Sequence, residues 1–468
     1  MDVTKIIIPP ELQQLIRSDL AWHYRILPKE ELESSYSFYI DQSANQLLAR
    51  EELSALLGKP VELFACDSNQ VQRSLGRYYR NTSGEDQKIV FDSNVDFVDR
   101  LIQEANKLGS SDIHIEIFGD SARIRIRIDG NLMHRFTIDK ADYPELVNKI
   151  KIRANLDISE KRLPQDGRIQ YEDFDIRVSI LPTLHGEKIV LRILGHDASS
   201  ISIDKVGFSD KEKISYLESV RKPNGIILIS GPTGSGKTTT LYATLKLLNI
   251  EKRNIVTVED PVEYTLDGIN QVQLNESIGL TFASALRSFL RQDPDVIMLG
   301  EIRDGETAQM AIRAALTGHL VLSTIHTNSA WGTISRLIDM GVPPFLLANT
   351  LNTSVAQRLI RKLCVNCKSK NELNKQDWPV GSLFEAPSAV TAAIGCDDCH
   401  FTGYKGRIAL YEVIPIDLKL ALEIKSNRHD VDDLLKERKI KNIAQRAYNE
   451  LLNGSTSLEE VYPLLSGY

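Results

Sequence analysis

The chain lacks any run of apolar residues near the roughly 18 that a helix needs to cross a bilayer, so no membrane-spanning segment is expected. Its first residues do not show the basic-then-apolar order of a secretory signal. Cysteine is scarce, with five among 468 residues, which argues against a disulfide framework and favours thiols or a metal site. We therefore expect a cytosolic protein that only a membrane-bound partner would hold at a membrane.

An excess of basic charge is missing as well. Lys and Arg number 56 against 63 Asp and Glu, a net charge of −7, and no basic stripe with interleaved aromatic residues is present. These features argue against a nucleic-acid partner. The charged fraction of 25% and the hydrophobic fraction of 42% are typical of a globular protein, and the length suggests about three domains.

Residues 1–80 form the first predicted unit. They mix helix-like segments at 11–27 and 45–57 with a short strand at 61–65, and they carry no recognisable chemistry. A polar linker rich in Ser, Gly, Asp and Lys is predicted at 81–92.

Residues 93–195 form a second unit, predicted to be an α+β domain. Apolar residues keep helical spacing from 97 to 108, and isoleucines alternate with arginines at 123–128. Asp129 and Gly130 predict a hairpin turn after that strand. Further strands are predicted at 113–117, 168–170, 175–180 and 188–193.

After a polar hinge at 196–205, the pattern changes in residues 206–468 to strands that alternate with helices. This rhythm is typical of a parallel sheet covered by helices on both faces. The strands are predicted at 225–230, 254–258, 296–300 and 320–324.

A glycine-rich turn follows the first of these strands, where residues 231–238 read Gly-Pro-Thr-Gly-Ser-Gly-Lys-Thr. The glycines let backbone N–H groups face phosphate oxygens, and the helical stretch at 239–248 points its N-terminal dipole at the anion. In this pattern Lys237 reaches the β- and γ-phosphates, and the Thr238 hydroxyl binds Mg²⁺. The sequence therefore predicts a site for ATP or GTP. The nucleotide-binding residues are predicted to be Gly231, Pro232, Thr233, Gly234, Ser235, Gly236, Lys237, Thr238 and Thr239.

Acidic residues follow the strand at 254–258, at the carboxyl end where catalytic side chains gather in an open α/β sheet. Glu259, Asp260 and Glu263 are each placed to orient an attacking water. The alternative is a solvated acidic turn without a catalytic role.

Glu301 follows the strand at 296–300 in a Walker B arrangement, with one departure: Gly300 stands where the Mg²⁺-binding Asp is expected. Thr238 would then be the main protein ligand of the metal, and Glu301 would act through water. The alternative is that Glu301 only pairs with Arg303.

Arginines and histidines near these strands are secondary candidates. Arg287, Arg291 and Arg303 can neutralise charge on a transferring phosphoryl group, although a surface Arg is more often solvated or weakly paired. His319 and His326 bracket the strand at 320–324 and are candidates for sensing the γ-phosphate.

Four cysteines form two pairs, Cys364 with Cys367 and Cys396 with Cys399. Each C-x-x-C pair supplies half of a tetrahedral thiolate site, for which Zn²⁺ is the usual metal. Residues 368–395 separate the pairs, a longer gap than the about 15–20 residues of a simple zinc ribbon. The second pair also spells the C-x-x-C-H of c-type haem attachment, which would leave the first pair unexplained.

Taken in order, GPTGSGKTTTLY, TVEDPVEY, LRSFLRQDPDVIMLGEIRD and TGHLVLSTIHTN resemble the secretion ATPases of type II secretion and type IV pilus assembly. Upstream, SDIHIE, RIRIDG, RLPQDGR and HGEKIVLR resemble the domain that precedes the motor in this family. Downstream, the paired C-x-x-C motifs and TGYKGRIALYEV resemble its metal insertion. The resemblance covers roughly residues 93–430, about three quarters of the chain.

The resemblance implies an α/β, RecA-like P-loop ATPase domain with a tetracysteine zinc insertion at about 360–405. An α+β, PAS-like domain and a small N-terminal docking domain would precede it. It also implies a homo-hexamer that hydrolyses ATP at the cytoplasmic face of a bacterial inner membrane. Inner-membrane platform and anchoring proteins would hold it there peripherally.

For single residues, the resemblance implies that Glu263 activates the attacking water with Glu301 beside it. Arg168 and Arg177 of the preceding domain would approach the nucleotide held by Lys237. By the same resemblance, Cys364, Cys367, Cys396 and Cys399 are zinc ligands.

Several functions remain open at the level of sequence. The leading hypothesis is the assembly ATPase of a type II secretion system, and its nearest rival is the extension ATPase of a type IV pilus. A retraction ATPase is disfavoured by the tetracysteine insertion. Other classes are a nucleic-acid motor, a zinc-bearing nucleic-acid binder, and a nucleotide-dependent scaffold without turnover.

Overall fold

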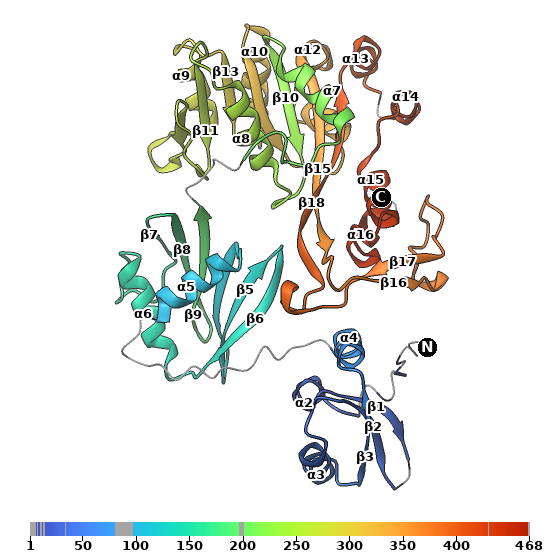
Figure 1. Cartoon of the computed structure of the whole chain (residues 1–468). Coiled ribbons are helices and arrows are strands. Elements are labelled where there is room, and N and C mark those ends of the chain that lie inside the picture. Colours follow the sequence, from blue (N-terminus) through green and yellow to red (C-terminus); the bar gives the residue numbers. More distant parts are fainter. Residues whose placement is uncertain are drawn as a thin grey trace.

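The computed structural model describes residues 6, 8–9, 12, 15–32, 34–79, 97–195, 201–428 and 430–466. The predicted linker at 81–92 and the start of the predicted hinge, 196–200, lie outside the described residues. The described part contains sheets of three, six and seven strands and a two-stranded ribbon, and the predicted α/β class is confirmed. Figure 1 shows the seven-stranded sheet above the six-stranded sheet, with the N-terminal unit below both.

The N-terminal unit packs helices on a three-stranded sheet. The helix predicted at 45–57 is capped by Asn45, whose side chain accepts a hydrogen bond from the Leu48 backbone. The helix predicted at 11–27 ends sooner, because Arg25 has a left-handed φ of 52° and a strand begins at the next residue. The described elements are α2 (Ser18–Tyr24), β1 (Ile26–Glu31), β2 (Tyr36–Asp41), α3 (Gln46–Leu57), β3 (Val61–Cys66) and α4 (Ser68–Tyr78).

The six-stranded sheet is antiparallel, with the order β6-β5-β4-β9-β8-β7. Asp129 and Gly130 have φ of 48° and 90°, which confirms the predicted hairpin turn. The isoleucines of the alternating strand pack with two helices, and its arginines lie on the opposite face. The elements are α5 (Phe97–Lys107), β4 (Asp112–Ile117), β5 (Ala122–Ile128), β6 (Asn131–Ile138), α6 (Tyr143–Arg153), β7 (Gln165–Gln170), β8 (Phe174–Thr183) and β9 (Gly186–Gly195).

The seven-stranded sheet has the order β12-β11-β13-β14-β10-β15-β18, and every neighbouring pair is parallel except the last. All four strands predicted here are present within one or two residues. The sheet and its helices comprise α7 (Asp210–Val220), β10 (Gly225–Ser230), α8 (Lys237–Leu248), β11 (Ile255–Glu259), β12 (Asn270–Gln273), α9 (Phe282–Phe289), β13 (Val296–Leu299), α10 (Gly305–Leu316), β14 (Leu320–Ile325), α11 (Gly332–Asp339), α12 (Pro344–Thr350), β15 (Leu351–Leu363) and β18 (Tyr404–Pro415).

Strands β15 and β18 are about twice as long as β10, and they continue beyond the sheet toward the cysteine insertion (Figure 1). The insertion and the C-terminal helices complete the chain. Their elements are β16 (Ser369–Glu372), β17 (Ala389–Ala392), α13 (Leu418–Lys425), α14 (Asp432–Glu437), α15 (Ile443–Leu452) and α16 (Leu458–Leu465).

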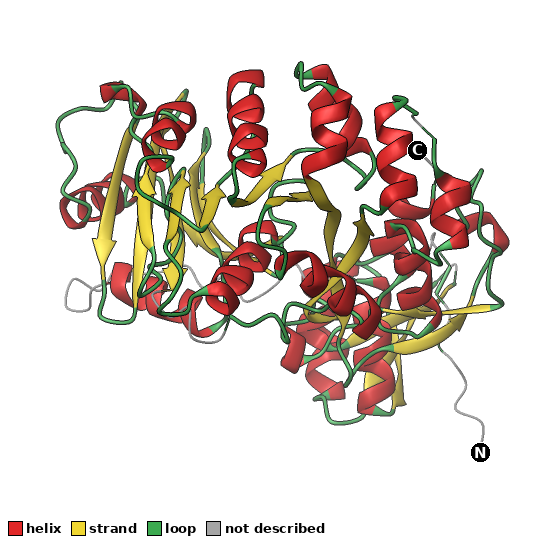
Figure 2. Ribbon diagram, turned by 90° about the horizontal axis from the view of Figure 1, so that it is seen from above, coloured by secondary structure: helices red, strands yellow, loops and turns green. Residues whose placement is uncertain are grey.

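Strand β10 lies between two hydrophobic core clusters of the described residues. Its side chains alternate: Ile226 and Leu228 pack in the cluster that includes α9 and α10, whereas Ile227 and Ile229 pack with α7 and α8. The view from above shows helices on both sides of the strands (Figure 2). Strand β10 is buried on both faces and pairs with β14 and β15 along its two edges, so the turn that follows it starts from a fixed point.

Among the described residues, side chains and backbone groups of different units meet at the β5–β6 turn and at Trp22. The backbone N–H of Gly406 at the start of β18 donates a hydrogen bond of 2.8 Å to the Asp129 carboxylate in the β5–β6 turn. The ring of Trp22 in the N-terminal unit meets Phe401, beside the second cysteine pair, edge to face with centroids 5.4 Å apart.

Shortening one buried side chain of β10 tests this packing. We expect Leu228→Ala, at a fully buried position, to lower the free energy of unfolding by about 2–5 kcal/mol in denaturant titrations. The same change at Leu247, which is 48% exposed on α8, is the matched control and should cost under about 1 kcal/mol. Equal losses would contradict the assignment of β10 to the core.

Candidate functional site

The glycine turn lies between β10 and α8, as predicted. Gly231, Gly234 and Gly236 have φ of 150°, 78° and 84°, which residues with a Cβ rarely adopt. A Cβ on Gly231 would lie 2.4 Å from the carbonyl oxygen of Gln357, and one on Gly236 would lie 2.8 Å from the Gln357 side chain. The turn therefore needs glycine both for its backbone conformation and for its close packing on β15.

Lys237 begins α8 inside this turn. Its Nζ donates hydrogen bonds to the carbonyl oxygens of Gly231 and Pro232, at 2.9 and 3.0 Å. Burial lowers the pKa of the Lys237 amine, and the nearby Glu301 carboxylate opposes that shift. Thr238 and Thr239 are exposed in the first turn of the same helix. The arrangement presents one cation, two hydroxyls and a helix N-terminus to the same space, which suits a polyphosphate.

Glu301 follows β13 at the same edge of the sheet. Its carboxylate pairs with Arg303 and lies 3.1 Å from Nε2 of His326, which follows β14. The predicted alternative, a pair with Arg303, is thus present, and His326 contacts the same carboxylate. Because the Glu301 carboxylate also opposes the lowering of the Lys237 pKa, it is near the phosphate turn as well as the strand end that carries His326.

The acidic turn after β11 separates its carboxylates into different environments. Glu259 is buried and accepts hydrogen bonds from the Tyr242 hydroxyl and from Thr257 at 2.6 Å. Asp260 is half-exposed and pairs with Arg303 at 3.6 Å. The Gln271 amide also donates to Glu259, at 3.1 Å, so Glu259 is held by three donors and fixes the turn.

Glu263 is the carboxylate that faces the six-stranded sheet. Burial raises the pKa of Glu263, and the cations Arg192 and Arg177 oppose that rise. The two arginines are directly opposite each other on β9 and β8, so their side chains share one face. A Cβ at Gly195, where β9 ends, would lie 3.9 Å from the Tyr264 ring, next to Glu263. The candidate site therefore spans two domains.

Some of the predicted residues lie elsewhere. His319 precedes β14 and contacts the carbonyl oxygen of Ala314 at 2.9 Å, so it lies at the opposite edge of the sheet from His326. Arg287 pairs with Glu306 at 2.6 Å, and Arg291 donates to the Arg287 carbonyl oxygen at 2.9 Å. These three residues are held within the helical layer or at the far edge, and the structure does not bring them to the phosphate turn.

Arg168 lies on the same sheet as Arg177. It lies on β7 directly opposite Arg177, on the face that carries the other arginines, and it pairs with Asp175. Sequence reasoning missed Arg192, although its motif was recognised, because the pairing of β8 with β9 is what places it beside Arg177. Gln357 was missed too, since polar residues in a strand give no motif.

The four paired cysteines converge. Their sulfur atoms all lie within 4.8 Å of one another, and three pairs are 3.7–3.8 Å apart. Four sulfurs placed tetrahedrally at about 2.3 Å from a zinc ion would be about 3.8 Å apart. Backbone N–H groups of Gly395 and Gly403 point at the sulfurs of Cys367 and Cys399, at 3.3 and 3.2 Å. The donor set fits one tetrahedral metal and does not leave the first pair unused, as haem attachment would.

Comparison with known families matches almost the whole chain. Residues 89–463 match the family described as type II/IV secretion system protein, and residues 2–85 match the MshEN domain. The second match covers the N-terminal unit, for which the sequence alone offered no chemistry.

Curated relatives come from both kinds of machine. The type IV pilus assembly ATPase PilB of Myxococcus xanthus (strain DK1622) is 38% identical over 97% of this chain and 86% of that protein. The type II secretion system protein E of Dickeya dadantii (strain 3937) is also 38% identical, over 97% of each chain. Among solved structures, the pilus retraction motor PilT with bound ADP is 27% identical, with a TM-score of 0.54 over 79% of this chain and 97% of that one.

The environment of Glu263 predicts a pH effect. Arg192→Gln removes a cation that favours the ionised carboxylate, so the pKa of Glu263 should rise. If ionised Glu263 accepts the proton of water, the acid limb of kcat at saturating ATP should move to higher pH. Arg287→Gln on α9 is the matched control and should leave the limb in place. An unmoved limb in folded Arg192→Gln would contradict the assignment.

Proposed function

The chain belongs to the type II/IV secretion system protein family and is an ATP hydrolase, and we propose that it couples hydrolysis to assembly of a pilin-like filament for type II protein secretion. The observation that supports this proposal most directly is a site formed by residues of two domains. Lys237 in its glycine turn lies near Glu301, and the six-stranded sheet brings Arg177 and Arg192 toward Glu263. Such a site can close when phosphates draw the arginines inward and open when product leaves.

In this mechanism Lys237 and the backbone N–H groups of residues 233–236 hold the β- and γ-phosphates. Bound Mg²⁺, with Thr238 as its protein ligand, would neutralise charge between these phosphates. Glu263 orients and deprotonates the attacking water, while Glu301, fixed by His326, borders the γ-phosphate. Arg177 and Arg192 then offset the negative charge that develops on the transferring group.

A type IV pilus assembly ATPase is the alternative, because the identity to PilB is as high as that to the secretion protein. The two readings share one mechanism and differ in the filament that is assembled.

For the assembly, we infer a homo-hexamer at the cytoplasmic face of the bacterial inner membrane. None of the helices in the described residues is both long and apolar enough to cross a membrane. The N-terminal unit would dock a cytoplasmic segment of an inner-membrane platform or anchoring protein. Its contact between Trp22 and Phe401 would carry movement of the cysteine insertion to that dock.

We also infer that Cys364, Cys367, Cys396 and Cys399 bind one Zn²⁺. The bound ion would tie the end of β15 to the start of β18 and close the loop at 368–395. Its role is structural, because four protein ligands leave no open coordination position.

Glu263→Gln tests the function directly. The variant should bind Mg·ATP as tightly as the native chain, since the phosphate turn is intact, and hydrolyse it about 10²–10⁴-fold more slowly. In cells that lack the native gene it should fail to restore export of secreted enzymes, whereas Glu218→Gln, an exposed change on α7, should restore it.

Two outcomes would contradict parts of this proposal. Native turnover in Glu263→Gln would remove this carboxylate from the chemistry. Loss of surface pili with normal enzyme export in the deletion strain would favour the pilus alternative.

Metal removal has its own prediction. We expect elemental analysis to find one zinc per chain in the native protein and none in Cys396→Ser, and residues 360–405 of the variant should become sensitive to protease. Cys66→Ser, outside the cluster, should keep the zinc. Unchanged zinc in Cys396→Ser, or a haem absorption band in the native protein, would refute the zinc site.

A further inference from the structure

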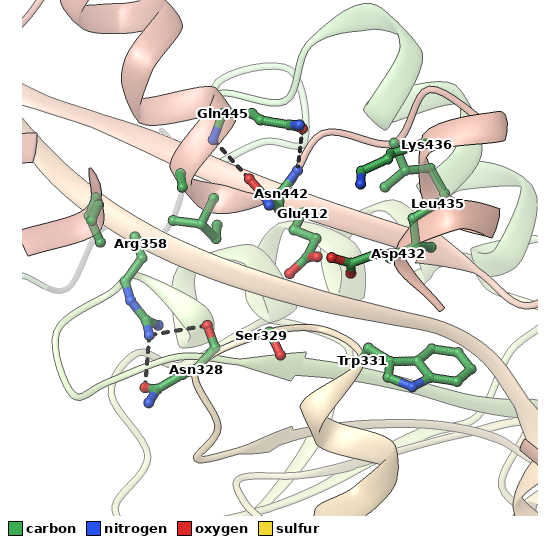
Figure 3. A pocket seen from close by; sticks show the side chains of 14 residues that line it. Asn328, Ser329, Trp331, Arg358, Glu412, Asp432, Leu435, Lys436, Asn442 and Gln445 are labelled. Carbon is green, nitrogen blue, oxygen red and sulfur yellow. Dashed lines mark hydrogen bonds between the residues drawn. The ribbon is translucent and has the colours of Figure 1, made fainter. Parts of the chain in front are cut away.

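A cavity of about 210 Å³ lies between the seven-stranded sheet and the C-terminal helices, and none of its lining residues belongs to the candidate nucleotide or metal site. Its walls come from the loop after β14, from β15 and β18, and from α14, α15 and α16. Figure 3 shows the carboxyl groups of Glu412 and Asp432 facing each other across it, with Lys436 nearby and Arg358 on the opposite side.

Glu412, on β18, is the buried member of this group, with 4% of its surface exposed. Its carboxylate accepts a hydrogen bond of 2.9 Å from the backbone N–H of Ala330, in the loop after β14. Burial, and to a smaller degree Asp432, raises the pKa of Glu412 to about 7, although the Ala330 N–H and Arg358 act the other way. A buried carboxylate with a single backbone partner is an unusual way to hold a loop, because a neutral side chain would cost less.

The loop held in this way, residues 326–331, leads directly to the candidate site. Its first residue, His326, contacts the Glu301 carboxylate at 3.1 Å. The middle of the loop is hydrogen-bonded to the two strands that pack beside the phosphate turn. Arg358 on β15 donates to the Asn328 side chain at 3.1 Å, and Ser230 on β10 donates to the Ser329 carbonyl oxygen at 3.4 Å. The loop therefore connects Glu301 at one end with Glu412 at the other.

Two elements contribute the other charged residues that line the cavity beside Glu412. Helix α14 contributes Asp432 and Lys436, both exposed, and β15 contributes Arg358. The residues that line the cavity from the loop after β14 and from α15 and α16 are uncharged. Asp432 is the group whose charge can be removed without disturbing the core.

We propose that Glu412 is a positioning residue for ATP hydrolysis: its ionised carboxylate holds the loop at 326–331, and the loop holds His326 against Glu301. The proposal rests on the proposed function, in which Glu301 and His326 border the γ-phosphate. An ionised acceptor binds an N–H more strongly than a neutral one, so protonation of Glu412 loosens the loop. Turnover should therefore fall as the pH drops through about 7.

The test is the pH dependence of kcat and of KM for ATP between pH 6 and 9 in the full-length protein. Glu412→Gln keeps the shape of the side chain and an acceptor for Ala330, but not its charge. We expect its kcat at pH 8 to fall about tenfold with KM within about twofold of the native value. Its inflection near pH 7 should disappear, and only the separate acid limb that Glu263 produces should remain.

Asp432→Asn is the second test variant, because it changes an exposed residue beside Glu412 and leaves Glu412 in place. Removal of the neighbouring negative charge should move the inflection to lower pH, with native kcat at pH 8. Asp433→Asn, the adjacent exposed change on α14 outside the cavity lining, is the matched control and should keep the native profile. A merely structural Glu412 would not make the profile depend on Asp432.

Native profiles in both Glu412→Gln and Asp432→Asn would overturn the proposal. If Glu412→Gln does not fold, an unmoved inflection in Asp432→Asn alone overturns it. Glu301→Gln in the same assay separates this failure from a failure of the proposed function. Turnover lost in Glu301→Gln but native in Glu412→Gln refutes only the positioning role, whereas native turnover in Glu301→Gln refutes the site itself.

Discussion

The common edge at which β10, β11, β13 and β14 end is the constraint on which the rest of the structure depends. These strands are parallel neighbours in one sheet, so the residue that follows each strand must lie along the same line. The glycine turn, the acidic turn, Glu301 and His326 are those residues. Since β10 is buried along its whole length, protein contacts alone fix the start of the turn that follows it.

Much of this edge could be predicted from sequence, because its information is local. The β10 strand, the glycine turn and each C-x-x-C pair are sequence patterns of only a few consecutive residues. Strand β15 could not be predicted, since its buried part contains Thr353, Ser354 and Gln357 instead of an apolar run. Their hydroxyl and amide groups are satisfied by partners from other elements, such as Ser219 for Thr353 and Thr240 for Gln357.

The parts of the site that the sequence does not place have a similar cause. Proximity in sequence does not reveal which end of a strand reaches the site, so His319 and His326 were equivalent candidates until β14 was oriented. Arg192 joined Arg177 only through strand pairing, and Glu263 met both only because two domains lie together. Long-range placement is thus the part of the site that a single sequence does not contain.

The central claim is that the phosphates of ATP lie between the glycine turn of one domain and two arginines of the other, Arg177 and Arg192. A crystal structure of the chain with Mg²⁺ and a non-hydrolysable ATP analogue tests it most directly. The account predicts that Lys237 Nζ and at least one guanidinium of Arg177 or Arg192 contact the β- or γ-phosphate oxygens at hydrogen-bond distance. An analogue bound at the glycine turn, with both arginines turned away to solvent, would contradict the account.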